Sequence, residues 1–261
     1  MANVSPRPLI IIAGVGNGSG VGGATAHLFA KEGYRVALIA RKAEEMAPLV
    51  AELIASGGEA AAFAVGAYTH AAVTALFPTI LTHAWPTPAP SALRVAVYNV
   101  GFVVRKPFLR VSPANLAGVV DANVHGVFAF ARAAVEAFRA NALDARGKRG
   151  TLVFTGATGS TRGGEITSAF SAGKFALRAL SQSLAKEFGK ENIHVAHVVI
   201  DGPVMTDWAM NNFGDISKDW KENLDVRVDP KGVAMAYLYL VGQDRSAWTW
   251  EMDMRPAHEK W

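Results

Sequence analysis

Apolar runs rich in β-branched residues alternate along this chain with alanine-rich amphipathic stretches, and this alternation limits the fold more than any other feature. The strand-like runs are Leu9–Ala13, Arg35–Ala40, Ala60–Val65, Arg94–Asn99, Thr151–Thr155 and His194–Ile200. The helix-like stretches are Gly22–Glu32, Ala43–Ser56, Ala71–His83, Ala114–Ala140 and Ser168–Phe188. Such alternation forms a parallel sheet with right-handed crossovers. The sequence therefore predicts an α/β fold with a doubly wound parallel sheet (the Rossmann arrangement) in a single domain over residues 1–261.

The composition agrees with a globular protein whose sheet is buried on both faces. Hydrophobic residues make up 51% of the chain and charged ones only 18%, as a parallel sheet covered by helices requires. The net charge is +4, but the lysines and arginines are spread along the chain. This argues against a nucleic-acid partner and agrees with an anionic small ligand. The absence of cysteine excludes disulfides and thiolate chemistry.

The N-terminal segment contains no pattern for targeting or membrane insertion. Met1–Arg7 is polar, and the apolar run that follows is shorter than a signal-peptide core or a membrane span. We therefore expect a cytoplasmic protein that acts on a small molecule without a membrane partner. No metal site is expected from the histidines, since His194 and His197 point to opposite faces of a predicted strand.

A glycine-rich loop joins the first predicted strand to the first predicted helix. The segment Gly14–Gly23 reads GVGNGSGVGG. Glycines permit a tight turn and let backbone N–H groups approach a diphosphate, while the N-terminus of the next helix adds a positive dipole. A loop without a ligand is the alternative. The position at the start of a βαβ pattern favours dinucleotide binding.

The second predicted strand ends in two cations. Sites selective for NAD place an acid there to hold the ribose hydroxyls, whereas this chain has Ala40 followed by Arg41 and Lys42. A guanidinium can pair with a 2′-phosphate through two hydrogen bonds. We predict NADP(H) as the cofactor. The alternative is that both cations simply lie on the surface at the strand end.

Motifs in the same order resemble those of the short-chain dehydrogenase/reductase family over nearly the whole chain. The family's TGxxxGxG matches the glycine loop, its NNAG matches Tyr98–Gly101, its helical Asn matches Asn123, and its PGxxxT matches Asp201–Thr206 with Asp201 in the Pro place. The resemblance implies a cofactor site made of Gly16, Ser19, Gly20, Val21, Gly22, Arg41, Lys42, Asn99, Gly101, Lys174, Val204 and Thr206. One departure is Gly66, which stands where the family has an Asp beside the adenine.

The catalytic motif of that family is only partly present. The family has YxxxK with a Ser thirteen residues before the Tyr, whereas this chain has Phe170 and Ala157 at these positions and keeps Lys174. Hydride addition to a ketone builds an alkoxide that needs a proton donor, and losing a general acid costs roughly 10²–10⁴ in rate. By resemblance, Lys174 still reaches the nicotinamide ribose, with Asn123 behind it.

Three explanations of the missing pair stay open. Another group could donate the proton, and Thr158 and Glu165 are the first candidates, followed by Ser160, Ser168 and Ser171; each could instead be a cap or a solvated loop residue. Alternatively, the substrate is an iminium ion, which needs no proton and would favour a nearby carboxylate such as Glu165. Finally, the protein could be a non-redox cyclase or an NADP(H)-binding regulator.

The amino-acid sequences of three segments resemble those of an atypical, fungal-like subgroup of the family. These are Phe154–Thr158, Ser168–Phe175 and Glu191–His197. Some members of that subgroup act in indole-alkaloid biosynthesis, where they reduce an iminium or guide a cycloaddition. The resemblance thus points to secondary metabolism and supports the second and third explanations.

The segment 205–229 takes the place of the family's variable substrate lid. It contains Met205, Trp208, Met210, Phe213 and Trp220, which would suit a bulky apolar or aromatic substrate or could simply pack the lid onto the body. The stretches Ala114–Ala140 and Ser168–Phe188 form the family's usual dimer surface, and Trp248 and Trp250 could add another. A homodimer or homotetramer is expected.

Taken together, the sequence favours an NADPH-dependent reductase that lacks the Ser–Tyr pair and transfers hydride to an imine, an iminium or another activated bulky substrate. A cyclase or a regulatory protein on the same scaffold is the alternative.

Overall fold

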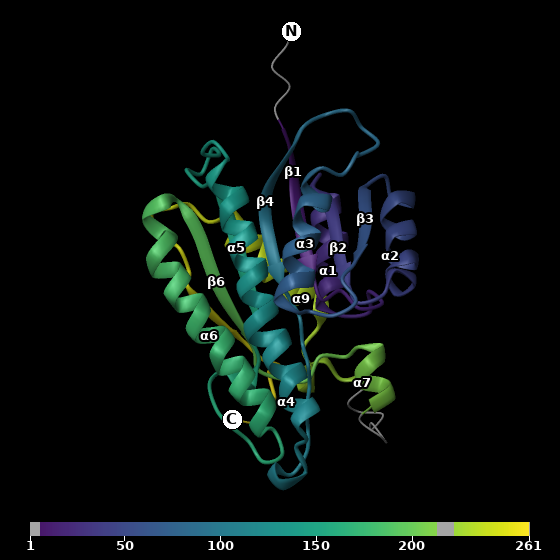
Figure 1. The fold of residues 1–261 in the computed structure, drawn as a ribbon, viewed down its shortest axis with the longest axis vertical. Coiled ribbons are helices and arrows are strands. Elements are labelled where there is room, and N and C mark those ends of the chain that lie inside the picture. Colours follow the sequence, from purple (N-terminus) through teal and green to yellow (C-terminus); the bar gives the residue numbers. More distant parts are fainter. Residues whose placement is uncertain (1–5, 213–221, 261) are drawn as a thin grey trace.

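Seven parallel strands form one sheet in the computed structural model of this protein (Figure 1), which describes residues 6–212 and 222–260. The strand order is β3-β2-β1-β4-β5-β6-β7, so the order reverses between β1 and β4. Every neighbouring pair is parallel. The predicted doubly wound sheet is therefore confirmed.

The elements follow one another in regular alternation. The strands are β1 (Arg7–Ala13), β2 (Arg35–Ala40), β3 (Glu59–Ala64), β4 (Ser91–Tyr98), β5 (Gly150–Thr155), β6 (Ile193–Ile200) and β7 (Glu251–Met254). The helices are α1 (Val21–Lys31), α2 (Ala43–Ala55), α3 (His70–Leu81), α4 (Pro113–Val120), α5 (Gly126–Arg139), α6 (Ser168–Phe188), α7 (Asp207–Asn212) and α9 (Pro230–Gly242).

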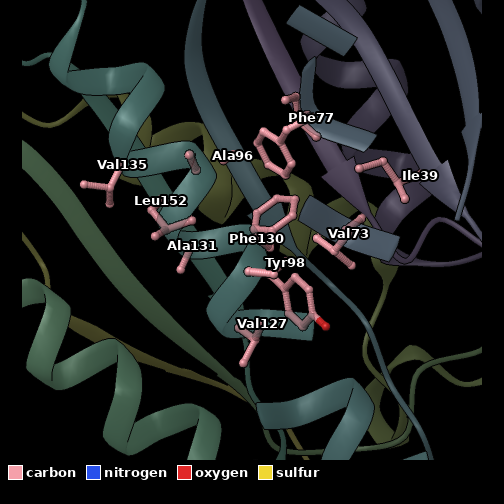
Figure 2. Close-up of a cluster of buried hydrophobic side chains, with 14 of the residues drawn as sticks. Ile39, Val73, Phe77, Ala96, Tyr98, Val127, Phe130, Ala131, Val135 and Leu152 are labelled. Carbon is pink, nitrogen blue, oxygen red and sulfur yellow. The ribbon is translucent and has the colours of Figure 1, made fainter. Parts of the chain in front are cut away.

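The sheet separates two apolar layers because successive side chains of a strand point to opposite faces. In β1, Leu9 and Ile11 belong to the layer beneath α3, α5 and α6, whereas Ile10 and Ile12 belong to the layer beneath α1, α2 and α9. Figure 2 shows the first layer, in which Phe130 lies between Phe77 and Tyr98 with ring centroids 5.3 and 5.2 Å apart.

Three features of the fold were not expected from the sequence. The seventh strand, β7, pairs with β6, and helix α9 packs against the sheet after the lid. The predicted helix Ala114–Ala140 is interrupted, because Asp121–His125 forms a π-helical turn between α4 and α5. Such turns are rare and often mark functional sites, and this one contains Asn123.

The tryptophans near the C-terminus make ring contacts within the chain. Trp248 stacks on His194 with centroids 4.9 Å apart, and the guanidinium of Arg178 lies 5.8 Å from the Trp250 ring. Both tryptophans remain partly exposed, so a further interface at this tail stays a prediction. Among the described residues, no helix is both long and apolar enough to cross a bilayer.

Candidate active site

A large cavity runs along the carboxyl ends of the strands, past the point where the strand order reverses. Its volume is about 950 Å³, and its lining includes the glycine loop, the ends of β4, β5 and β6, and the start of α6. A smaller cavity of about 160 Å³ shares Gly14, Gly16 and Arg41 with it. Open α/β sheets bind ligands at this edge, at such a switch point.

The glycine loop packs too closely against the rest of the fold for larger residues. A Cβ on Gly14 would lie 2.6 Å from the backbone of Asn99, and the φ of Gly14 is +87°. The Asn99 side chain donates a 2.8 Å hydrogen bond to the Gly14 carbonyl. A Cβ on Gly22 would lie 2.8 Å from Cα of Val15. These contacts hold the loop against the end of β4.

The open side of the same loop faces the cavity, as a dinucleotide site requires. Gly16 has a φ of +56° and no heavy atom within 4 Å of where its Cβ would be. Helix α1 begins at Val21, and its N-cap, Gly20, supplies no side-chain hydrogen bond, which leaves backbone N–H groups at the cavity wall. The residues present therefore fit a diphosphate.

Hydrogen bonds tie the glycine loop to the start of the lid. Ser19 Oγ accepts from the backbone N–H of Asp207, and Asn17 pairs with the Asp207 carboxylate at 2.6 Å. A Cβ on Gly20 would meet the Thr206 methyl at 2.9 Å. Val204 and Thr206 line the cavity beside the loop, so the structure brings these predicted cofactor residues together.

At the end of β2, the two predicted cations are placed differently. Arg41 lines both cavities. Lys42 lines neither, and its ammonium lies 3.5 Å from the Glu45 carboxylate on the surface. Arg41 is therefore directly on the cavity wall, whereas Lys42 is exposed and pairs with Glu45, which itself lines the small cavity.

The small cavity has aromatic walls that sequence reasoning missed. Tyr68 and Phe102 line it, together with Gly101, and the Tyr68 hydroxyl donates to the Ile39 carbonyl at 3.2 Å. Gly66, which replaces the family's Asp, has a φ of +64° and is absent from the lining. A ring two residues beyond that glycine therefore bounds the pocket in place of a carboxylate.

Lys174 lies buried where the strand ends meet helix α6. Its Nζ donates to the carbonyls of Thr155 and Val100 at 2.9 and 3.2 Å. Burial lowers the pKa of Lys174 to about 8. Asn123 packs against Gly173 of α6 and donates to the Val119 carbonyl at 3.0 Å. Asn123 Oδ1 has no hydrogen-bond partner among the described residues.

Phe170 lines the cavity one helical turn before Lys174, and Ala157 lines it as well. None of the chain's five tyrosines, all within the described ranges, lines this larger cavity. Tyr237 is buried with its hydroxyl 2.6 Å from Thr155 Oγ1, and the Tyr98 hydroxyl donates to the Ala122 carbonyl. The described lining thus offers no phenol as a proton donor.

The candidate surrogate donors do not converge on one point. Thr158 lines the cavity, but its hydroxyl donates to Asp201 Oδ1 at 2.7 Å. Glu165 is exposed and lies outside the lining. Ser160 is fully buried, where its Oγ accepts from the Ala157 N–H. Ser168 is exposed and also outside the lining, whereas Ser171 lines the cavity with its Oγ 3.2 Å from Thr167 Oγ1.

A charge cluster at the far end of the cavity was not anticipated. The buried carboxylate of Asp201 accepts two hydrogen bonds from Arg162, at 2.9 and 3.0 Å, and lies 3.1 Å from Arg255. Arg162 and Glu259 line the cavity. The one signal in the sequence was Asp201 itself, which departs from the family's Pro.

Among the described residues of the lid, one aromatic ring contributes to the lining. Trp208 of α7 lines the cavity and is half exposed. Met205 and Met210 are partly buried but absent from the lining, and Phe213 and Trp220 lie outside the described residues. No group of three or more His, Asp or Glu side chains in residues 6–212 and 222–260 is placed to hold a metal ion.

Comparisons with known proteins identify the family. A family model described as enoyl-(acyl carrier protein) reductase matches residues 14–252. A 3-dehydrosphinganine reductase of Arabidopsis thaliana is 29% identical over 69% of this chain and 51% of that protein, so the chain spans about half the length of the first curated relatives it matches.

Solved structures agree with this assignment. A short-chain dehydrogenase from Rhodopseudomonas palustris is 34% identical, with a TM-score of 0.75 over 96% of this chain and all of that one. A 3-oxoacyl (acyl-carrier-protein) reductase from Agrobacterium tumefaciens, solved with NADP bound, shares the fold at 22% identity and a TM-score of 0.81, over 97% and 95% of the two chains. The cavity at the switch point, the family model and the 34% identical structure lead to one conclusion: the chain belongs to the short-chain dehydrogenase/reductase family.

Proposed function

We propose that this protein is an NADP(H)-dependent reductase that transfers hydride to an imine, an iminium or another activated, bulky substrate. One observation supports this most directly: Phe170 lines the cavity one turn before Lys174, and no tyrosine lines that cavity. Ketone reduction there would lack its usual acid and lose roughly 10²–10⁴ in rate. An iminium carbon is already electrophilic, so its reduction consumes no proton.

The cofactor assignment is supported by the contacts of the glycine loop and by Arg41. Backbone N–H groups at the start of α1 face the cavity and can hold the diphosphate. Arg41 can pair with a 2′-phosphate, and Lys174 can hold the ribose hydroxyls. When bound, NADPH supplies the hydride. The structurally similar reductase from Agrobacterium tumefaciens was solved with NADP, which supports the same choice.

The substrate end favours a large ring system over a small polar molecule. Phe170, Trp208 and Val103 line it, and the cavity volume of about 950 Å³ is ample for a cofactor and a further ligand. The resemblance of the segment around Phe170 to members of the indole-alkaloid pathways supports an iminium substrate from secondary metabolism.

The test compares an iminium with a ketone of the same shape. NADPH oxidation would be followed with a dihydroisoquinolinium ion and with tetralone as its carbocyclic ketone analogue. We expect turnover of the iminium and little of the ketone. The double variant with Ala157→Ser and Phe170→Tyr restores the pair and should raise ketone turnover by roughly 10²-fold or more.

A matched control adds a phenol outside the cavity. Phe108→Tyr, at a 75% exposed position that lines neither cavity, should leave both rates as they are. Ready turnover of the ketone by the unchanged protein would contradict the proposal. Binding of NADPH without oxidation by either substrate would favour the cyclase or regulatory alternative.

We also propose that the protein is a homodimer or homotetramer assembled through α4, α5 and α6. The resemblance to the family places its dimer surface on these helices, where Phe128 on α5 and Phe175 on α6 are 51% and 43% exposed. Light scattering should give a dimer or tetramer mass. Phe128→Glu should shift it toward the monomer, and a monomeric mass for the unchanged chain would contradict the proposal.

A further inference from the structure

Thr158 directly follows Ala157, the position where the family keeps its catalytic Ser, and it lines the cavity, but its hydroxyl donates its hydrogen bond to a buried carboxylate. Its Oγ1 lies 2.7 Å from Oδ1 of Asp201. An ionised carboxylate can only accept hydrogen bonds, and a threonine hydroxyl carries a single proton. The proton of Thr158 therefore lies on its bond to Asp201.

Asp201 is held in its ionised form by the groups around it. Its side chain is 1% exposed and accepts two hydrogen bonds from Arg162, and Nη2 of Arg255 lies 3.1 Å from Oδ2. Burial alone would raise the pKa of Asp201, but the hydrogen bonds from Thr158 and Arg162 outweigh it and keep that pKa below its usual value. At neutral pH the carboxylate therefore remains an acceptor.

Thr158 consequently presents an acceptor to the substrate. The residue lines the cavity. Its hydroxyl proton is engaged by Asp201, but the lone pairs of Oγ1 can still accept a hydrogen bond. A hydroxyl that donates a hydrogen bond to a carboxylate has a more electron-rich oxygen than a free hydroxyl, because hydrogen bonds in a chain polarise one another. This arrangement is the reverse of a serine that donates its proton to a carbonyl oxygen.

The polarity of this oxygen discriminates between the two kinds of substrate. A ketone oxygen carries only lone pairs and would meet Thr158 as one acceptor facing another. A protonated imine carries an N–H donor. We infer that Thr158 is a specificity-determining residue that accepts a hydrogen bond from an N–H iminium and so selects it over a ketone, with Asp201 as the positioning residue. This inference rests on the proposed function.

Thr167 provides a matched control in the same cavity. It also lines the wall, but its hydroxyl donates to the carbonyl of Gly164 at 2.9 Å rather than to a carboxylate. Nothing in its contacts polarises its oxygen in the way Asp201 polarises Thr158. Loss of the Thr167 hydroxyl should therefore leave the discrimination between substrates unchanged.

The experiment measures kcat/KM with two iminium ions that differ only in the N–H group. One is protonated dihydroisoquinoline, used at a pH that keeps its nitrogen protonated, and the other is its N-methyl iminium. The unchanged protein should prefer the N–H ion. Thr158→Val should lower the N–H to N-methyl ratio about five- to ten-fold, the value of one hydrogen bond. Thr158→Ser and Thr167→Val should keep it.

Each outcome decides the inference separately from the proposed function. If both ions are reduced and Thr158→Val keeps the ratio of the two kcat/KM values, Thr158 does not recognise the N–H group, and the inference is overturned while the reductase assignment stands. If neither ion is reduced, the proposed function fails. In that case, calorimetry measures the binding of two saturated amines, the ammonium ion with N–H groups and its N,N-dimethyl analogue. If the unchanged protein prefers the N–H ammonium and Thr158→Val loses this preference, the inference is supported. If Thr158→Val retains the preference, the inference is overturned.

Discussion

The two ends of the large cavity are built in different ways. At the cofactor end, one continuous segment, 14–22, supplies much of the cavity lining, and five of its nine residues are glycines. At the substrate end, Thr158 and Arg162 of the wall, which follow β5, are held by the buried Asp201 after β6, and Asp201 also pairs with Arg255 after β7. The first end depends on local conformation, whereas the second depends on charged side chains brought together by the sheet.

This difference decides how each end should respond to substitution. A binding site made of backbone loses affinity when an added side-chain atom clashes with neighbouring backbone, because the sheet holds that backbone in place. A network of charges loses stability in proportion to the hydrogen bonds removed, and its strength changes with pH. The predictions below exploit that contrast, from the largest expected effect to the smallest.

The largest effect is expected from Gly14→Ala. Its Cβ would lie 2.6 Å from the backbone of Asn99, whereas a Cβ on Gly33, with a similar φ of +82°, meets no atom within 4 Å. Both changes force alanine into the left-handed region at roughly 1–2 kcal/mol. Only Gly14→Ala should also weaken NADPH binding, by about 100-fold or more, which is about 3 kcal/mol. Calorimetric titration of both variants is the check, and equal affinities would refute the contrast.

Next comes the pair of cations after β2. Arg41→Ala should weaken NADPH binding roughly 10- to 100-fold, because it removes hydrogen bonds to a charged phosphate. NADH binding should change little. Lys42→Ala is the matched control, since Lys42 lines neither cavity. Should both variants lose NADPH affinity equally, the surface placement of Lys42 would not describe the bound state.

Asp201→Asn tests the charge network at the substrate end. The pKa of Asp201 lies below its ordinary value of 3.8 in the fold, so the carboxylate stabilises the protein above that value and its contribution disappears as the pH falls through the lower, folded pKa. The variant should be about 1–3 kcal/mol less stable at neutral pH. Denaturant unfolding at neutral and acidic pH should show this difference shrinking in acid.

A control for that series is Asp253→Asn. Asp253 pairs with the same Arg255 but is 46% exposed on its side chain, so its loss should change stability by less than about 1 kcal/mol. A pH-independent difference for Asp201→Asn would mean that its charge does not carry the stabilisation.

The smallest effect is expected from Tyr237→Phe. This buried hydroxyl lies 2.6 Å from Thr155 Oγ1, and losing that hydrogen bond should cost about 1 kcal/mol in thermal or denaturant unfolding. Tyr237 does not line the cavity, so NADPH oxidation should be unaffected. Tyr239→Phe, at a 58% exposed position, should change neither quantity. A large loss of activity in Tyr237→Phe would reveal a hidden proton donor.

Sequence reasoning succeeded where the signal was local. The alternation of apolar runs predicted six of the seven strands, and the glycine loop lies at the cavity. It missed β7, because Glu251–Met254 alternates acids with methionines and pairs with β6 only at the sheet edge. It named Thr158 and Glu165 only as candidate proton donors, since spacing along a loop does not show where its side chains lie; in the structure the Thr158 hydroxyl donates to Asp201, and Glu165 is exposed outside the lining.

The sequence by itself determined the fold, the place of the cofactor loop and the replacement of the family's Tyr and Ser by Phe170 and Ala157. These follow from periodicity and from glycines whose conformations are set by neighbours in the chain. Only the tertiary structure decided that Arg41 rather than Lys42 lines the cavity, and that the Thr158 hydroxyl donates its hydrogen bond to Asp201. Those facts depend on contacts between side chains from distant segments at one edge of the sheet, and a local sequence pattern does not show such contacts.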